Sequence, residues 1–367
     1  MLPEISSAML VVTHGCNLEC RYCFVRQGAE RMSPETAWEA VEFLSRNAER
    51  SGEVPAINFF GGEPLLMWDG LIEPLVRRVR AEGRPFRFSV TTNGTLLTGE
   101  RMDFMRREGF GLLLSMDGVR EVQDANRPFH GGRGSFDALE GVVPEVLARW
   151  PGTTLRMTAV PASCRWLFKS ILWAERAGFR SFFVVPNVFE SWDAAAWAEL
   201  EHSVFNYADL YAARHGRGEE CIRFSTFERM LRDLGPGGRE RAALRRRAEN
   251  KCGLGAGRFA SIAPDGAIYA CQELCSNGGR ESPFYIGNLR EGVSEERRRH
   301  LMGSYSAERS RGERGCGGCP CAELCDGGCA ANNYLATGRL NILPEVYCRW
   351  MRLLLRAAER VRRDMDG

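Results

Sequence analysis

The chain has 367 residues, of which 44% are hydrophobic and 26% are charged, with a net charge of +2, an ordinary composition for a globular protein with one large core or one core and a smaller module. It contains no run of about 18 apolar residues and no N-terminal export signal, so we expect neither a membrane span nor secretion. Fourteen cysteines in such a chain predict metal or redox chemistry in a reducing cytoplasm rather than a disulfide framework.

Strand and helix patterns alternate through the first half of the chain. Ser33 followed by Pro34 predicts the start of a helix, because serine caps a helix N-terminus and proline fits its first turn. We expect strands at residues 9–12, 56–60, 86–91, 111–115, 154–160 and 182–185. We expect further helices at residues 66–80, 98–107, 136–149 and 166–177. About six strands, each followed by a crossover helix, predict an α/β fold with a parallel sheet whose ligands bind at the carboxyl ends of the strands.

The pattern changes near residue 193. Residues 193–250 are arginine-rich and helical in pattern, whereas residues 251–367 are rich in cysteine and glycine. We therefore expect a core over residues 1–192, a helical linker or insert, and a cysteine-rich domain. Arginine runs at residues 245–247 and 297–299 could bind RNA or an acidic peptide. Because acidic residues are interspersed nearby, we interpret the runs as solvated helix faces and expect no nucleic-acid partner.

Three cysteines within eight residues, Cys16, Cys20 and Cys23, directly follow the first predicted strand. Three thiolates in one loop can hold a cube of four irons and four sulfides, which leaves one iron without a protein ligand. An open iron is a reactive site, whereas a fully ligated cluster mainly carries electrons. A zinc loop and a chance cluster are the alternatives.

This spacing, Cys-x3-Cys-x2-Cys, resembles that of the radical S-adenosylmethionine (radical SAM) superfamily. The resemblance implies an open, partial (β/α)6 barrel and an iron that chelates the amino and carboxylate groups of SAM. It also implies that an electron from a donor such as flavodoxin or ferredoxin cleaves SAM, and that the 5′-deoxyadenosyl radical then takes a hydrogen from the substrate. By the same resemblance, Tyr22 and Phe24 in this loop would contact SAM.

Other short motifs follow the predicted strands. Gly61-Gly62-Glu63 resembles the superfamily's GGE motif, which contacts the amino group of SAM, although it could be a plain turn. Asn93 and Ser115 are expected to contact the ribose or carboxylate of SAM. For Asp117 and Arg127, a ligand contact and a purely structural role are equally open, and no residue is assigned as catalytic. The histidines show no paired spacing.

The C-terminal cysteines form a longer pattern. Residues 259–263 and 267–271 flank Pro264-Asp265-Gly266, which predicts a β-hairpin. The cysteine order resembles that of the SPASM domain, which extends radical SAM enzymes that act on peptides and proteins; a zinc ribbon is the alternative. The resemblance implies two auxiliary 4Fe–4S clusters and therefore three clusters in total. The first auxiliary cluster would be held by Cys252, Cys271 and Cys329, and the second by Cys316, Cys319, Cys325 and Cys348.

Two positions depart from the sulfatase-maturing members of this group. Arg258 stands where those proteins carry a further cysteine, and Gln272 stands where they carry an aspartate thought to act as a base. Cys275 could supply the missing ligand; otherwise the first auxiliary cluster is open and a substrate thiolate could bind it. The remaining cysteines, Cys164, Cys221 and Cys321, are interpreted as ordinary buried thiols.

Three functional hypotheses follow. The first is a maturase that cross-links a ribosomally made, possibly cysteine-containing peptide, for example through a thioether. The second is an anaerobic sulfatase-type maturase that oxidises cysteine or serine to formylglycine, and the third is a non-catalytic iron–sulfur electron carrier. Only fifteen residues precede Cys16, so we expect no N-terminal leader-binding domain and allow for a separate leader-binding protein.

Overall fold

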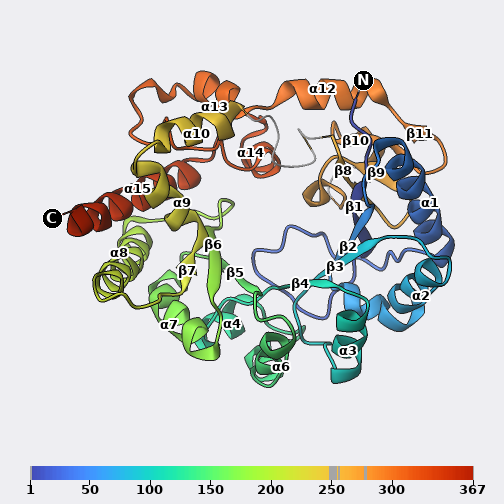
Figure 1. The fold of residues 1–367 in the computed structure, drawn as a ribbon, viewed down its shortest axis with the longest axis horizontal. Coiled ribbons are helices and arrows are strands. Elements are labelled where there is room, and N and C mark those ends of the chain that lie inside the picture. The colour runs from blue at the N-terminus through green and yellow to red at the C-terminus, as the bar shows by residue number, and fades with distance from the viewer. Residues whose placement is uncertain (1, 248–253, 255–256, 277–278, 367) are drawn as a thin grey trace. The chain divides into compact units, whose positions relative to one another are not determined.

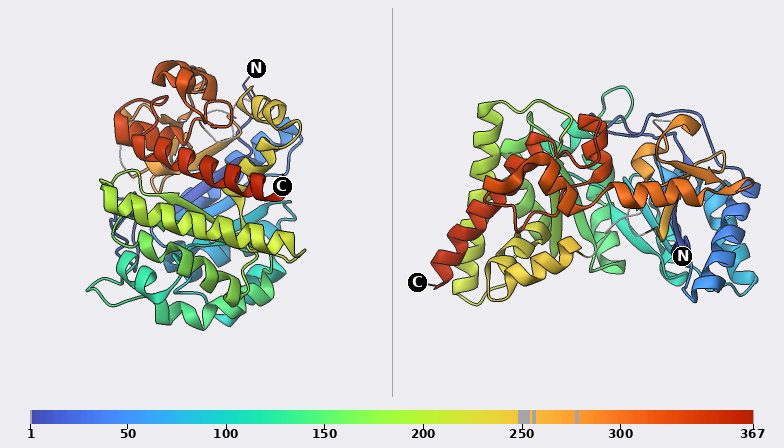
Figure 2. Two further views of the ribbon diagram at one scale, coloured as in Figure 1. Left: turned by 90° about the vertical axis from the view of Figure 1, so that its left-hand side faces the viewer. Right: turned by 90° about the horizontal axis from the view of Figure 1, so that it is seen from above.

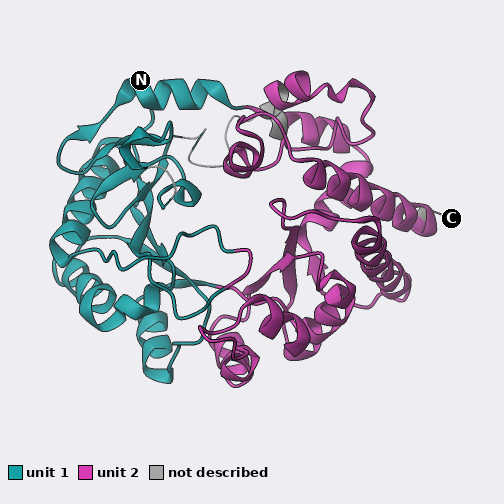
Figure 3. Ribbon diagram, turned by 180° about the vertical axis from the view of Figure 1, so that it is seen from behind, with its two compact units in different colours: residues 1–19, 23–113, 249–305 teal, residues 20–22, 114–248, 306–367 magenta. Residues whose placement is uncertain are grey.

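The computed structural model describes residues 2–247, 254, 257–276 and 279–366 (Figure 1). The chain forms two compact units, each assembled from separate stretches of sequence (Figure 3). Unit 1 comprises residues 1–19, 23–113 and 249–305, and unit 2 comprises residues 20–22, 114–248 and 306–367. These units are defined by contacts in space and combine separate stretches of the chain. The three consecutive domains expected from the sequence are a division by function, and they remain a prediction.

Unit 1 is built on an eight-stranded sheet with the order β11-β10-β9-β8-β1-β2-β3-β4. Its strands are β1 (Ser7–Thr13), β2 (Ala56–Gly61), β3 (Arg87–Thr92), β4 (Gly111–Leu114), β8 (Phe259–Ile262), β9 (Ala267–Tyr269), β10 (Tyr285–Asn288) and β11 (Gly292–Val293). β1 pairs in parallel with β2 on one side and with β8 on the other, and β8 to β11 pair antiparallel. The C-terminal hairpin therefore extends the same sheet that carries the cysteine loop.

The hairpin between β8 and β9 confirms the turn predicted around Asp265. The Asp265 carboxylate accepts a 3.0 Å hydrogen bond from the backbone N–H of Ala267. Gly266 has a φ of +82°, a conformation that a side chain disfavours.

The helices of unit 1 are α1 (Pro34–Ser51), α2 (Glu73–Ala81), α3 (Gly99–Arg107) and α12 (Glu295–Ser304). Ser33 caps α1 as predicted, since its hydroxyl accepts a 3.1 Å bond from the Thr36 N–H. The single helix predicted at residues 66–80 is wrong: a 3-10 turn (Pro64–Met67) and a π turn (Trp68–Ile72) precede α2. Pro74 lacks an N–H to continue a regular helix, and the Glu73 N–H bonds to the Trp68 carbonyl five residues back.

Unit 2 contains a parallel sheet of β5 (Thr154–Ala159), β6 (Ser181–Pro186) and β7 (Arg223–Phe224). Its helices are α4 (Arg120–Asn126), α5 (Phe136–Glu140), α6 (Val142–Arg149), α7 (Leu167–Ala177), α8 (Ala194–Gly216), α9 (Ser225–Leu234), α10 (Gly238–Arg247), α13 (Ala307–Arg314), α14 (Ala330–Thr337) and α15 (Glu345–Asp366). The helix predicted at residues 136–149 is two helices, broken at Gly141, where the missing side chain weakens helical preference. β7 was not predicted, because a strand of two residues leaves no alternating pattern.

Long helices and aromatic packing stabilise unit 2. α8 and α15 lie side by side in both views of Figure 2 and pack against each other. Tyr207 of α8 and Phe227 of α9 have ring centroids 5.4 Å apart, and Phe224 lies 6.0 Å from Trp350 of α15. These four side chains are almost fully buried, so α15 closes the apolar side of this unit.

No helix among the described residues is both long and apolar enough to cross a membrane.

Candidate metal and cofactor site

The cysteine loop begins where β1 ends and is held from its first residue. The Thr13 hydroxyl donates a 2.9 Å bond to the Glu30 carbonyl and accepts a 3.0 Å bond from the Gly15 N–H. Two residues after Cys16, the Leu18 N–H points at the Cys16 sulfur at 3.4 Å. An N–H aimed at sulfur is a contact typical of thiolates that bind iron–sulfur clusters.

None of the thirteen described cysteines forms a disulfide bond, so disulfide pairing does not occupy the sulfurs of Cys16, Cys20 and Cys23. Cys23 is exposed, and the other two are partly exposed. Among the described residues, no group of three or more His, Cys, Asp or Glu side chains is arranged to hold a single metal ion. Three soft sulfur donors in one loop are the donor set of an iron–sulfur cluster, so these residues fit the cofactor that the sequence predicts.

Gly61 and Gly62 hold the start of this loop by close backbone contact. The Gly62 N–H donates a 2.9 Å bond to the Thr13 carbonyl, and the Glu63 N–H donates a 2.9 Å bond to the Gly15 carbonyl. A Cβ on Gly62 would lie 2.2 Å from the Gly15 oxygen, and one on Gly61 would lie 2.2 Å from the Thr13 oxygen. The two glycines therefore let the end of β2 lie directly against the cysteine loop.

The carboxylate of Glu63 is completely buried and fully engaged by the protein. It accepts hydrogen bonds from the Leu65 N–H at 3.0 Å, the Thr92 hydroxyl at 2.8 Å and the Asn93 N–H at 2.8 Å. Desolvation raises the pKa of Glu63 to about 7, although these hydrogen bonds act in the opposite direction. The side chain thus ties the end of β2 to the end of β3, and a contact between this motif and SAM remains a prediction.

Asn93 lies beside the first cysteine, as expected for a residue at the end of β3. Its amide nitrogen lies 2.9 Å from the Asn17 side-chain oxygen and 3.9 Å from the Cys16 sulfur. Asn17 in turn donates to the Thr95 hydroxyl at 2.8 Å, and Thr95 donates to Asn93 at 2.7 Å. Sequence reasoning missed Asn17 and Thr95, although short polar residues beside a cysteine and after a strand were a usable signal.

The remaining predicted SAM contacts lie on different elements. Phe24 stacks on Phe60 of β2, with ring centroids 6.2 Å apart. Tyr22 belongs to unit 2, where its hydroxyl donates to the carboxylate of Asp117. Ser115 is half-buried and forms an isolated parallel bridge with Arg156 of β5. None of these contacts tests a SAM-binding role, which remains a prediction for all three residues.

The structure brings the four cysteines of the second predicted auxiliary cluster into one neighbourhood of unit 2. The pKa of Cys325 is raised to about 12, mainly by burial, and nearby Cys348 and Cys316 contribute to the rise. Arg352 interacts electrostatically with both Cys348 and Cys319. Arg314 donates a hydrogen bond to Cys348, and both arginines pair with Glu345. A cluster bound here would have two cations beside its sulfurs.

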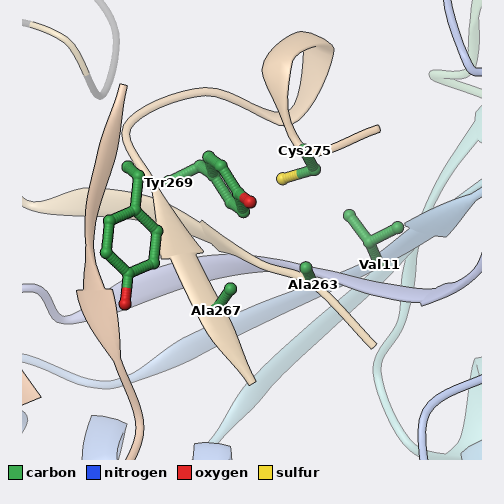
Figure 4. Close-up of a cluster of buried hydrophobic side chains, with 6 residues drawn as sticks. Val11, Ala263, Ala267, Tyr269 and Cys275 are labelled. Carbon is green, nitrogen blue, oxygen red and sulfur yellow. The ribbon is translucent and has the colours of Figure 1, made fainter. Parts of the chain in front are cut away.

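Cys271, assigned to the first auxiliary cluster, and Cys275, the possible replacement ligand, lie in different surroundings, and Cys252 lies outside the described residues. Cys271 is partly exposed, whereas Cys275 is buried in a cluster with Val11, Ala263, Ala267, Tyr269 and Tyr285 (Figure 4). Burial raises the pKa of the Cys275 thiol well above its usual value. An apolar shell favours a protonated, packed thiol over a thiolate ligand.

Arg258 and Gln272, the two positions that differ from sulfatase-maturing proteins, both lie in the part of the chain that the structure describes. Arg258 pairs with Glu53, and its side chain is 59% exposed, so the charge points toward solvent. Its carbonyl accepts 3.0 and 3.1 Å bonds from the N–H groups of Ser6 and Ser7, which seats the start of β8 against β1. Gln272 lies in a 3-10 turn directly after Cys271.

Comparison with known proteins agrees with this geometry. Residues 10–163 match the model of the radical SAM superfamily. Over 130 residues the chain is 29% identical to the radical SAM cyclopropyl synthase TigE of Paramaledivibacter caminithermalis, an alignment covering 31% of this chain and 27% of that protein. Over 134 residues it is 33% identical to the serine-type anaerobic sulfatase-maturating enzyme of Klebsiella aerogenes, covering 35% of this chain and 33% of that protein. The chain thus spans between about a quarter and a third of the length of these curated relatives.

Likeness in structure extends much further than likeness in sequence. The solved structure of native anSMEcpe with bound AdoMet and Cp18Cys peptide superposes with a TM-score of 0.73 over 97% of both chains, at 18% identity. This identity establishes a shared fold and nothing beyond it. The predicted fold class, an α/β fold with a parallel sheet of the radical SAM type, is confirmed.

The site and the comparisons agree on the class of protein that this part of the chain resembles. Residues 10–163, which carry the three-cysteine loop and the GGE segment, match the radical SAM superfamily. That resemblance implies a 4Fe–4S cluster and SAM as cofactors.

Proposed function

We propose that the protein is a maturase that oxidatively cross-links a ribosomally made peptide, for example by closing a thioether. The observation that carries this proposal is the three-cysteine loop, held against the GGE segment by the close contacts of Gly61 and Gly62. Cys16, Cys20 and Cys23 would hold the SAM-binding cluster. Asn93, Ser115, Tyr22 and Phe24, with the Gly61–Glu63 segment, would line the SAM site.

A bound cluster would supply the electron that cleaves SAM and so provide the hydrogen-abstracting radical. The protein's own contribution is to orient the cluster loop and SAM and to exclude water from the site. Glu63 and the two glycines fix the loop, and Asn93 with Asn17 holds polar groups beside Cys16. These contacts preorganise the site before SAM binds.

Two auxiliary clusters complete the proposal. Cys316, Cys319, Cys325 and Cys348 would hold one, and Cys252, Cys271 and Cys329 would hold the other. Closing a thioether removes one hydrogen atom from carbon and one proton from sulfur, so one further electron must leave the substrate. The auxiliary clusters would accept that electron and return it to a flavodoxin- or ferredoxin-type donor.

Proteins similar to this chain support a peptide partner. The structure with a TM-score of 0.73 contains a bound peptide, and two relatives bear the names of a cyclopropyl synthase and a sulfatase-maturating enzyme. A separate leader-binding protein is part of the proposal.

The experiment is anaerobic reconstitution followed by incubation with SAM, a reductant and the small peptides encoded beside the gene. The expected product is a peptide lighter by two hydrogens, accompanied by 5′-deoxyadenosine. A product of unchanged mass, or one carrying added groups, would contradict cross-linking. The absence of 5′-deoxyadenosine under all conditions would favour a non-catalytic electron carrier.

Formylglycine formation is the second candidate, favoured by the match over 97% of both chains to anSMEcpe. Arg258 and Gln272 stand against it, because they replace a cluster cysteine and a base in that group. The discriminating experiment uses a cysteine- or serine-containing sulfatase-motif peptide. Aldehyde formation would place this candidate first.

A further inference from the structure

Asp117 lies three residues beyond β4, and its side chain is fully buried in unit 2. Its carboxylate accepts hydrogen bonds from the Tyr22 hydroxyl, from Asn126 at 3.1 Å and from the Thr158 N–H at 2.9 Å. Arg127 completes the set, since its Nη2 donates a 3.4 Å bond to one carboxylate oxygen and its Nε lies 3.2 Å from the other as an ion-pair contact. An ionised carboxylate can accept this many hydrogen bonds at once, because its two oxygens offer about four acceptor sites and it carries no proton.

The ion pair is embedded in a closed ring of hydrogen bonds. The Asp117 N–H donates to Gln123 at 2.9 Å, Gln123 donates to Ser135 at 2.8 Å, and the Ser135 hydroxyl donates to the Arg127 carbonyl at 2.6 Å. Gln123 and Ser135 are fully buried, and the Arg127 side chain is only 9% exposed. A buried charge pair with this many hydrogen bonds to its carboxylate loses several of them if it moves, so the ring restrains the position of the carboxylate.

Two hydrogen bonds join this group of residues to the cysteine loop. Tyr22 is bonded through its hydroxyl to Asp117, and the Arg21 N–H donates a 3.0 Å bond to the Asn126 carbonyl. The Arg127 guanidinium lies 5.2 Å from the centroid of the Tyr22 ring. Residues 20–22 are therefore held by backbone, hydroxyl and ring face, and all these contacts lie within unit 2.

We propose that Asp117 is a positioning residue for the iron–sulfur loop, acting through Tyr22 on the neighbouring ligand Cys20. Arg127 compensates the buried charge, and the ring through Gln123 and Ser135 keeps the pair in place. The inference rests on the proposed role of Cys16, Cys20 and Cys23 as ligands of the SAM-binding cluster. It predicts that loss of the Tyr22 hydroxyl changes the cluster without unfolding the chain.

Tyr22→Phe is the decisive variant, because it removes one hydroxyl and keeps the ring, the ion pair and all three cysteines. The measurements are iron content, the electron paramagnetic resonance (EPR) spectrum of the reduced protein with and without SAM, and the dissociation constant for SAM. We expect wild-type iron content, an altered SAM-dependent spectrum and SAM binding weakened about tenfold, the size expected when a hydrogen bond to a charged group is lost.

The matched control is Tyr207→Phe, which removes another buried tyrosine hydroxyl of the same unit. The Tyr207 hydroxyl donates to the Ile222 carbonyl at 2.9 Å and accepts from the Phe224 N–H at 3.1 Å. Its removal should lower the melting temperature and leave the EPR spectrum and SAM affinity at wild-type values. A general loss of packing would instead move both variants alike.

Asp117→Asn and the double variant with Tyr22→Phe test whether the two residues act together. If Asp117 acts through Tyr22, the double variant should weaken SAM binding no more than the stronger single variant. Additive losses, or a Tyr22→Phe protein with wild-type spectrum and SAM affinity, would overturn the inference alone. A wild-type protein without any SAM-responsive cluster signal would instead refute the proposed function and this inference with it.

Discussion

The backbone N–H of Asn93 donates a 2.8 Å hydrogen bond to the buried carboxylate of Glu63. This bond joins the end of β3 to the end of β2. The N–H of Glu63 itself donates to the Gly15 carbonyl at 2.9 Å, one residue before Cys16. The ends of two strands and the start of the cysteine loop are thus joined by one hydrogen-bond network. The geometry of the loop therefore depends on Glu63, which is not itself a cluster ligand.

Glu63→Gln should destabilise the protein by about 1–3 kcal/mol, because the amide nitrogen would face backbone donors that need an acceptor. The measurement is urea unfolding of the apo-protein under anaerobic, reducing conditions. Glu295→Gln is the matched control, since Glu295 is 64% exposed and pairs with Arg299 one turn away. The control should change the free energy of unfolding by less than about 0.5 kcal/mol. Equal effects from the two substitutions would contradict the assigned role of Glu63.

The pKa of about 7 at Glu63 gives this comparison a pH dependence. The folded state holds the proton more tightly than the unfolded state, whose carboxyl has an ordinary pKa near 4.5. Between these values the folded state binds more protons, so the contribution of Glu63 to stability falls as the pH rises. We expect the unfolding free energy of the wild type, relative to Glu63→Gln, to decline from about pH 5 to pH 7.5 and then level off. A flat or rising difference would show that the carboxyl is ionised throughout.

Gly62→Ala should prevent correct formation of the loop, since its Cβ would lie 2.2 Å from the Gly15 carbonyl oxygen. Backbone on both sides leaves little room to relax, so we expect a loss of about 3 kcal/mol or more and reduced iron uptake on reconstitution. Gly99→Ala is the control, because a Cβ there meets nothing within 4 Å and the residue lies at the start of α3. That change should be neutral or slightly stabilising. Iron uptake by Gly62→Ala equal to that of the control would be incompatible with the close contact.

Much of the fold follows from the sequence because its signals are local. Ser33 and Thr98 cap helices through their own hydroxyls, and the strands of the parallel sheet are short apolar runs. The break before α2 was less accessible, because a π turn depends on how Pro74 meets the carbonyls of the preceding turn. The pairing of β8 with β1 joins segments about 250 residues apart and leaves no local signal at all.

In the candidate site, too, some features follow from local sequence and others depend on contacts between distant segments. The spacing of Cys16, Cys20 and Cys23 is a property of the sequence and predicts their chemistry directly. The internal role of the Glu63 carboxylate could not be predicted, because it depends on which donors β3 brings to it in space. The apolar shell around Cys275 is likewise assembled from several strands and a turn, so its spacing alone made it a plausible ligand.

Cys275 should resist alkylation in the folded apo-protein. It is 7% exposed and its pKa is raised by burial, whereas Cys23 is exposed. Because the thiolate is the reactive form, iodoacetamide at neutral pH should label Cys23 at least tenfold faster. Peptide mass spectrometry after a timed anaerobic quench measures both rates in one sample, and denatured protein provides the reference for full reactivity. Equal rates in the folded protein would mean that Cys275 is accessible, and would return it to the candidate ligands.

Iron content after anaerobic reconstitution tests the whole assignment. Three cubes of about four irons each predict about twelve irons per chain. Replacing Cys16, Cys20 and Cys23 together by alanine should remove about four, and replacing Cys316, Cys319, Cys325 and Cys348 should remove another four. Cys321→Ala is the internal control, because Cys321 lies in the same segment but is only 2% exposed, whereas the four assigned cysteines are partly exposed. It should keep the full iron content, because the cysteine pattern assigns Cys321 to no cluster. A wild type with about four irons that fall to none in the first variant would leave the second cysteine set without iron and overturn the SPASM assignment.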